Sequence, residues 1–153
     1  MLSAGARAPQ FVLKDLDGTE HSLDGLREQG PAVLVFFKVS CPTCQLALPF
    51  VERIAAKAPR LIAISQDPAP ATRDFRSYFH LSMPMLLDPA GDGYAVSNAF
   101  GITHVPTFFL ISADGMVEHS FTGFVKTDLE ELGRQYGVET FRPDEKVPFL
   151  KPG

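Results

Sequence analysis

The stretch Ala32-Val-Leu-Val-Phe-Phe-Lys-Val-Ser-Cys-Pro-Thr-Cys-Gln-Leu-Ala-Leu-Pro49 joins an apolar run to a segment with helical spacing, and it carries both cysteines of the chain. The run 32–37 shows no polar alternation, which is typical of a strand covered on both faces in the middle of a sheet. After Cys41, apolar residues recur with helical spacing, at Leu46, Phe50, Val51, Ile54 and Ala55. The stretch therefore predicts a central strand followed by a helix whose first turn holds Cys41 and Cys44.

Other segments extend this unit to an α/β fold. Residues 61–65 form a second buried run, so the strand, helix, strand unit should cross over right-handed and make the sheet at least partly parallel. Upstream, Asp17-Gly18 lies between two short extended runs and predicts a hairpin, followed by a short helix over 24–30. Downstream, the pattern predicts helices over 72–79, 90–100 and 128–136, a short strand within 83–89, and an antiparallel hairpin of 107–111 with 116–123.

The whole chain, residues 1–153, is expected to fold as one domain. Its length suits a single domain, and 45% hydrophobic with 21% charged residues is typical of globular proteins. No internal repeat or linker divides the chain. Residues 5–30 are expected to form an amino-terminal hairpin and short helix. Residues 137–153 are expected to form an irregular tail, because they combine three prolines with no periodic pattern.

Charge and hydropathy argue against two classes of partner. The net charge is -4 and no predicted element gathers Lys and Arg, so no nucleic acid is expected as a partner. No window approaches the roughly 18 apolar residues of a membrane span, and the amino end lacks a basic region followed by an apolar run. We therefore expect no membrane partner and a cytoplasmic location, while the oligomeric state is not predicted.

Cys41 and Cys44 are the candidate catalytic residues, because both lie in the first turn of the predicted helix. Backbone N–H groups in the first turn of a helix lack internal partners and the helix dipole is positive there, so a thiolate is favoured. Such positions lower the pKa of a thiol from about 8.5 to between about 3.5 and 7.5, which makes Cys41 the predicted nucleophile. Cys44 lies about one turn further along the same face and is the predicted resolving thiol. Pro42 suits the first helical position, because its missing N–H would have no partner there.

A zinc site is the main alternative interpretation of the cysteine pair. It would need two further ligands, which would come from the four histidines of the chain, His21, His80, His104 and His119. No two of these histidines have ligand-like spacing. We therefore expect neither a metal nor another cofactor.

The segments Phe36–Pro49 and His104–Thr107 together resemble the thioredoxin-like superfamily. In that family a Cys-x-x-Cys begins the first main helix, a proline five residues after the second cysteine kinks it, and a cis-proline faces the dithiol. Pro49 and Pro106 take those two positions; most X-Pro bonds are trans, so the cis assignment of Pro106 comes from the resemblance. The resemblance implies a three-layer fold with a central mixed sheet flanked by helices. It also implies that the substrate-binding residues are Pro42, Thr43, Val105 and Pro106.

Within that superfamily, the amino-terminal hairpin and the inserted segment 68–100, which precedes the cis-proline loop, resemble the redoxin subgroup. This subgroup includes TlpA-like and ResA-like thiol-disulfide oxidoreductases and the peroxiredoxins related to AhpC/TSA. The resemblance covers residues 5–136 and leaves the tail outside. It also implies that His104 would lie near the dithiol, where it could relay protons or tune a pKa; an exposed loop histidine is the alternative.

Four positions depart from the patterns of these relatives. Thioredoxins usually have a tryptophan before the first cysteine and an acidic residue six before it, where this chain has Ser40 and Val35. Peroxiredoxins have a proline and a Thr or Ser where this chain has Leu34 and Lys38. The charge of Lys38 is a candidate for lowering the pKa of the Cys41 thiol, although a solvated lysine at the strand end is the alternative.

Three functions follow from these residues and the resemblance. The leading one is a thiol-disulfide oxidoreductase that exchanges the Cys41–Cys44 pair with disulfide-bearing proteins or small molecules and is recycled by an upstream thiol reductant. The second is a thiol peroxidase with antioxidant activity, in which Cys41 becomes a sulfenic acid and Cys44 condenses with it. The third is a non-catalytic module that binds a partner through the thioredoxin-like groove or the tail.

Overall fold

A computed structural model describes residues 1–153, and its middle layer is a mixed seven-stranded sheet. The elements in chain order are β1 (Val12–Asp15), β2 (Glu20–Ser22), α1 (Leu23–Leu26), β3 (Ala32–Phe37), α2 (Pro42–Ala55), β4 (Leu61–Ser65), α3 (Ala69–Tyr78), β5 (Met85–Leu87), the 3-10 turn η1 (Ala90–Asp92), α4 (Ala95–Ala99), β6 (Thr107–Ile111), β7 (Val117–Thr122), β8 (Phe124–Val125), α5 (Lys126–Gln135) and β9 (Leu150–Lys151). None of the helices has the length and apolar character that crossing a bilayer requires.

The central strand of the sheet is β3, as its apolar run predicts. The strand order is β2-β1-β5-β4-β3-β6-β7, with β3 parallel to β4 and antiparallel to β6. All six residues of β3 are buried. The parallel β3–β4 pair is joined through α2, which is the predicted strand, helix, strand unit. The mixed sheet therefore confirms the expected fold class.

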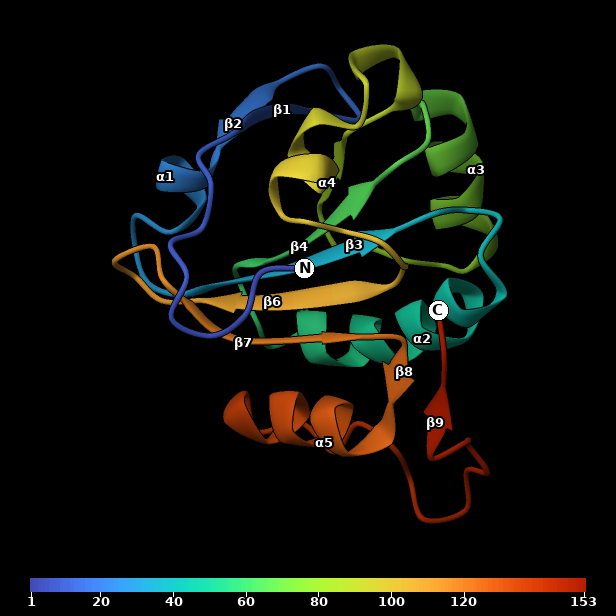
Figure 1. Ribbon diagram of the computed structural model, residues 1–153. Helices are drawn as coiled ribbons and strands as arrows, with labels where there is room; N and C mark the ends of the chain where they lie inside the picture. The colour runs from blue at the N-terminus through green and yellow to red at the C-terminus, as the bar shows by residue number, and fades with distance from the viewer.

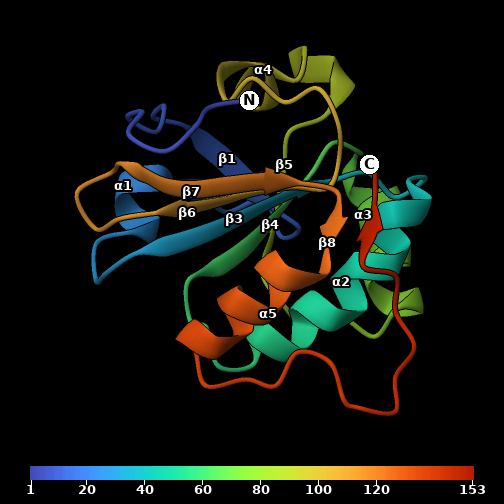
Figure 2. The same ribbon diagram turned by 60° about the horizontal axis from the view of Figure 1, so that its bottom comes forward.

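Side chains of β3 point alternately into two cores, one on each face of the sheet. Val33, Val35 and Phe37 belong to the core that includes residues of α2, α3 and α5, whereas Leu34 and Phe36 belong to the core that includes residues of α1 and α4. Figure 2 shows α2 and α5 together on one side of the sheet and α4 on the other. These three layers are the arrangement that the resemblance implied.

The prediction of one continuous helix over 90–100 is wrong. The segment divides into η1 and α4, because Gly93 and Tyr94 both have positive φ angles, of 67° and 51°. The buried carboxylate of Asp88 then accepts hydrogen bonds from the backbone N–H groups of Val96 and Ser97 at 3.2 and 2.6 Å. This carboxylate satisfies N–H groups at the start of α4 that have no partner within the helix.

The tail, which was expected to be irregular, contains one short strand. Residues 150–151 form β9, which pairs antiparallel with β8 in a separate two-stranded sheet. The backbone N–H of Lys126 donates to the carbonyl of Phe149 at 3.0 Å, which extends this pairing. Both views show β8 and β9 side by side, with the carboxyl end near the start of α2 (Figures 1 and 2). Backbone pairing of so short a strand leaves no periodic pattern in the sequence.

An ion pair holds the first part of the tail against α2. The guanidinium of Arg53 donates to both carboxylate oxygens of Glu145 at 2.7 Å and to the carbonyl of Thr140 at 2.9 Å. This guanidinium holds the pKa of the Glu145 carboxyl down at about 2. The tail is therefore fixed at two places, by Arg53 and by the β8–β9 pair.

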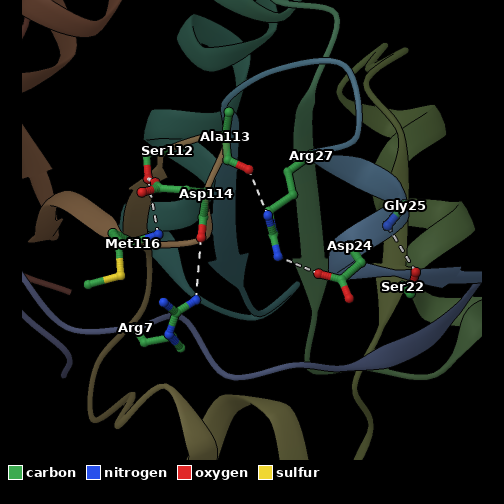
Figure 3. A network of polar contacts seen from close by, with 9 residues as sticks. All are labelled: Arg7, Ser22, Asp24, Gly25, Arg27, Ser112, Ala113, Asp114 and Met116. Carbon is green, nitrogen blue, oxygen red and sulfur yellow. Dashed lines mark hydrogen bonds and ion pairs between the residues drawn. The ribbon is translucent and has the colours of Figure 1, made fainter.

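A polar network ties α1 to the turn between β6 and β7 (Figure 3). The Arg27 guanidinium donates to the carbonyl of Ala113 at 2.6 Å and forms an ion pair with Asp24. In the same turn, the backbone N–H of Met116 donates to the Ser112 hydroxyl at 3.0 Å. Because Ile111 pairs with Ala32 at the beginning of β3, this network lies at the opposite end of the strand from the cysteines.

Candidate active site

Both cysteines lie in the first turn of α2, as predicted from the sequence. Cys41 is the residue that caps this helix and Pro42 opens it, where a proline ring with its fixed φ angle fits well. The Cys41 sulfur accepts a hydrogen bond from the backbone N–H of Cys44 at 3.1 Å. The capping position thus places the Cys41 sulfur against a backbone N–H group at the start of α2, one turn from the Cys44 thiol.

The two thiols differ in their access to solvent. Cys41 is half-buried, whereas Cys44 is fully buried among apolar residues. Burial raises the pKa of the Cys44 thiol, and its hydrogen bond with the Cys41 thiol raises that pKa further. A substrate disulfide can therefore meet Cys41, while Cys44 stays a protonated thiol behind it.

A loop with a cis peptide bond lies beside the dithiol. The bond between Val105 and Pro106 is cis, as the resemblance implied. Thr107 begins β6 directly after it and pairs with Phe36 near the end of β3, so the sheet register carries the loop to the cysteines. The Cys41 sulfur is 3.4 Å from the Val105 carbonyl oxygen, to which it donates.

The side chains of Lys38 and His104 lie near the loop and form no hydrogen bond or ion pair with either sulfur. Together with Val105 they line a hollow of about 230 Å³. The ammonium group of Lys38 lies 5.5 Å from the centre of the Tyr94 ring, and the Nδ1 atom of His104 is 3.1 Å from the Thr103 hydroxyl. The roles of Lys38 and His104 in tuning a pKa therefore stay predictions.

Thr43 and Pro42, the residues between the cysteines, have different surroundings. Pro42 is exposed, whereas Thr43 is buried and its hydroxyl donates to the carbonyl of Pro152 at 2.7 Å. The sequence did not predict that Pro152 and Gly153 lie at the site, because the tail has no motif that relates it to the cysteines. The substrate-binding roles of Pro42, Thr43, Val105 and Pro106 stay predictions.

The residues around the pair do not form a metal centre. No group of three or more His, Cys, Asp or Glu side chains is placed to hold a metal ion. The polar groups that act on the Cys44 thiol are Cys41 and the backbone of Lys38 and of Cys44 itself, with no carboxylate among them. The site therefore consists of two thiols, a helix end and a backbone loop, which is a donor set suited to thiol chemistry.

A helix that begins at a dithiol, facing a cis-proline loop across a mixed sheet, defines a protein of the thioredoxin-fold dithiol class. Within that class the chain belongs to the Redoxin family, whose model matches residues 3–136. It is 30% identical over 136 residues to the thiol-disulfide oxidoreductase ResA of Geobacillus thermodenitrificans, covering 85% of this chain and 76% of the relative. It is also 30% identical over 133 residues to ResA of Halalkalibacterium halodurans, covering 84% and 73% of the two chains.

Solved structures give the same class. The chain superposes on MTB dsbF with a TM-score of 0.70 and 30% identity, covering 83% of this chain and 92% of that chain. It superposes on a putative thiol:disulfide interchange protein DsbE from Chlorobium tepidum with a TM-score of 0.75 and 25% identity, covering 88% and 96%. With these relatives and the close Cys41–Cys44 pair, the chain is a thiol-disulfide oxidoreductase, the leading function expected from the sequence.

Proposed function

We propose that Cys41 is the attacking thiol and Cys44 the resolving thiol in exchange with disulfide-bearing polypeptides. The Cys41 thiolate attacks one sulfur of the substrate disulfide, which forms a mixed disulfide and releases the other sulfur as a thiolate. Cys44 then loses its proton and attacks the Cys41 sulfur. This step forms the Cys41–Cys44 disulfide and releases the second substrate thiol, so two electrons pass to the substrate.

The difference in burial between the two thiols supports this order. Cys41 is reachable from outside, while the fully buried Cys44 can meet only a group that is already attached to Cys41. The backbone N–H of Cys44 lies 3.1 Å from the Cys41 sulfur, where it can stabilise negative charge on that atom. The half-buried Cys41 thiol therefore captures the substrate, and the fully buried Cys44 thiol releases it.

Serine variants test the two roles. Cys41→Ser should abolish turnover, because no nucleophile then reaches the substrate. Cys44→Ser should accumulate a mixed disulfide with the substrate, which non-reducing electrophoresis and mass spectrometry detect. A Cys41→Ser protein that still reduces a disulfide at the native rate would refute the assignment, as would a mixed disulfide trapped on Cys44 in that variant.

We also propose that an upstream thiol reductant returns the oxidised pair to the dithiol, so that the protein works as a reductant. The direction depends on how strongly the reduced form is stabilised, and this stabilisation would come from the Cys41 thiolate, because burial keeps Cys44 a protonated thiol. Equilibration with glutathione or dithiothreitol buffers measures the reduction potential. A value near about -270 mV supports the reducing direction, and a value near about -120 mV contradicts it.

The peroxidase alternative gains no support from the site. Leu34, which stands at the proline position of the peroxiredoxin pattern, is fully buried in β3. Lys38, which stands at the Thr or Ser position, directs its ammonium group to the Tyr94 ring. Neither residue offers a hydroxyl group beside Cys41, so we propose no peroxide chemistry for it.

A further inference from the structure

The last residues of the chain lie against the loop that is expected to receive the substrate. At Gly153 an added Cβ atom would fall 2.2 Å from the carbonyl oxygen of Val105 and 2.8 Å from its carbonyl carbon. Real Cβ atoms do not approach non-bonded atoms this closely, so a larger residue at this position would force the segment or the loop to shift. The chain therefore covers the backbone of Val105, the group that also accepts the Cys41 S–H at 3.4 Å.

A hydrogen bond and a close backbone approach position these residues. Thr43, between the cysteines, donates its hydroxyl to the carbonyl of Pro152 at 2.7 Å. On the other side, Gly123 has φ of +83°, and a Cβ atom there would lie 2.7 Å from the carbonyl oxygen of Lys151. Residues 150–153, which we call the terminal strand, thus lie between the start of α2 and the β7–β8 junction and reach the cis-proline loop.

The terminal strand is held weakly compared with the rest of the tail. Within it, only the two residues of β9 pair with another strand. The side chain of Leu150 is 58% exposed, and that of the preceding Phe149 is 68% exposed. The terminal strand therefore buries little apolar surface, and a segment of low local stability can detach without unfolding the core. The ion pair of Arg53 with Glu145 lies upstream and can keep the tail attached while the strand moves.

We propose that the terminal strand is an intramolecular occupant of the substrate groove, which extended polypeptide disulfides must displace before they react with Cys41. This inference rests on the proposed function, in which a substrate strand binds the backbone of Val105 beside Pro106. Small disulfides need no such strand pairing and reach the half-exposed Cys41 with the terminal strand in place. A strand bound in nine of ten molecules lowers the apparent affinity for the competing polypeptide about tenfold.

Two variants of the chain release the terminal strand by different means. Gly153→Val forces a side chain against the Val105 carbonyl. Lys151→Pro removes a backbone N–H from β9, where position 151 pairs with Phe124. Gly91→Val is the matched control, because Gly91 is exposed, has no positive φ and would place a Cβ atom in open space. Amide exchange at Lys126, whose N–H bonds to Phe149, reports whether the strand has left.

Each protein is assayed with a polypeptide and a small disulfide. The polypeptide is insulin with dithiothreitol as electron donor, and the small disulfide is Ellman's reagent added to the pre-reduced protein. We expect kcat/KM for insulin to rise up to about tenfold in both releasing variants, with the Ellman's reagent rate within about twofold of the native one. The control should match the native protein in both assays and in amide exchange at Lys126.

Other outcomes separate this inference from the proposed function. Faster exchange at Lys126 with an unchanged insulin rate would show that the strand does not compete with the substrate. Unchanged exchange in both variants would show that these contacts do not hold the strand, and this also overturns the inference. If the native protein reacted with neither insulin nor Ellman's reagent, the proposed function would be overturned instead.

Discussion

The surroundings of Cys44 control when its thiol loses a proton. Its burial and its contact with Cys41 raise its pKa, and no carboxylate acts on it. Val35, which stands where thioredoxins usually carry an acidic residue, is itself fully buried in the same core. With no carboxylate beside it, the Cys44 proton passes to the substrate thiolate released in the first step, to His104 or to solvent, and this links the resolving step to pH.

The resolving step should accelerate with pH across the neutral and mildly alkaline range. Only the thiolate form of Cys44 attacks, and its burial, which persists when Cys41 is in the mixed disulfide, raises its pKa above that of a free thiol. The rate of release from the Cys41 mixed disulfide should therefore rise about tenfold per pH unit, as the thiolate fraction does, with no plateau below pH 9. Stopped-flow single turnover measures this rate, and a plateau near neutral pH would reveal an internal base.

At the scale of elements, β3, α2 and β6 follow from the sequence because continuous burial and helical periodicity leave plain patterns. The helix end at Cys41 and Pro42 is equally readable, since capping is local. The cis bond before Pro106 could be assigned only by resemblance. The break at Gly93 and Tyr94 was not predicted, because the carboxylate that bonds the start of α4 belongs to Asp88, which lies before η1 and not directly before the helix. The β8–β9 pair was not predicted, because β9 pairs with Phe124, which is distant in the sequence.

The start of α4 should depend on Asp88. Its buried carboxylate accepts two backbone N–H groups and the Ser97 hydroxyl at 2.7 Å, so Asp88→Ala leaves buried donors without partners. We expect the free energy of unfolding to fall by about 2 kcal/mol, in the range for a lost charged cap. Urea denaturation measures the loss. The exposed neighbour Asp92 serves as a control, and an equal loss in Asp92→Ala would contradict this role.

The tail should loosen in acid because of Glu145. Its pKa in the folded protein is about 2, below the ordinary value of 4.5, so the stability that it contributes is present above pH 4.5 and is lost as pH falls toward 2. Glu145→Gln should remove this contribution, and its unfolding free energy should approach that of the native protein between pH 4.5 and 2. Urea titrations across this range measure it. For Glu139→Gln, an exposed change in the same tail, the unfolding free energy should vary with pH as it does in the native protein.

At the scale of the whole molecule, one end of β3 leads to the active site and the other end is held by a stabilising network. Its carboxyl end leads to Cys41 and faces the cis-proline loop, whereas its amino end pairs Ala32 with Ile111 next to the network of Arg27. The two buried cores on either face of β3 join these ends into one rigid layer. Changes at the amino end should therefore alter stability without altering the site.

Substitution of Arg27 tests this separation. Its guanidinium, with a side chain only 18% exposed, bonds the carbonyl of Ala113, and Arg27→Ala leaves that carbonyl without this donor. We expect about 1 kcal/mol loss of unfolding free energy, as for one lost hydrogen bond, since the exposed Asp24 partner adds little. The disulfide reduction rate should stay native. Arg134→Ala, which breaks an exposed pair with Glu131, should change neither quantity measurably. A reduction rate that fell with Arg27→Ala would mean that the network acts on the cysteines through the length of β3, and the division between scaffold and site would fail.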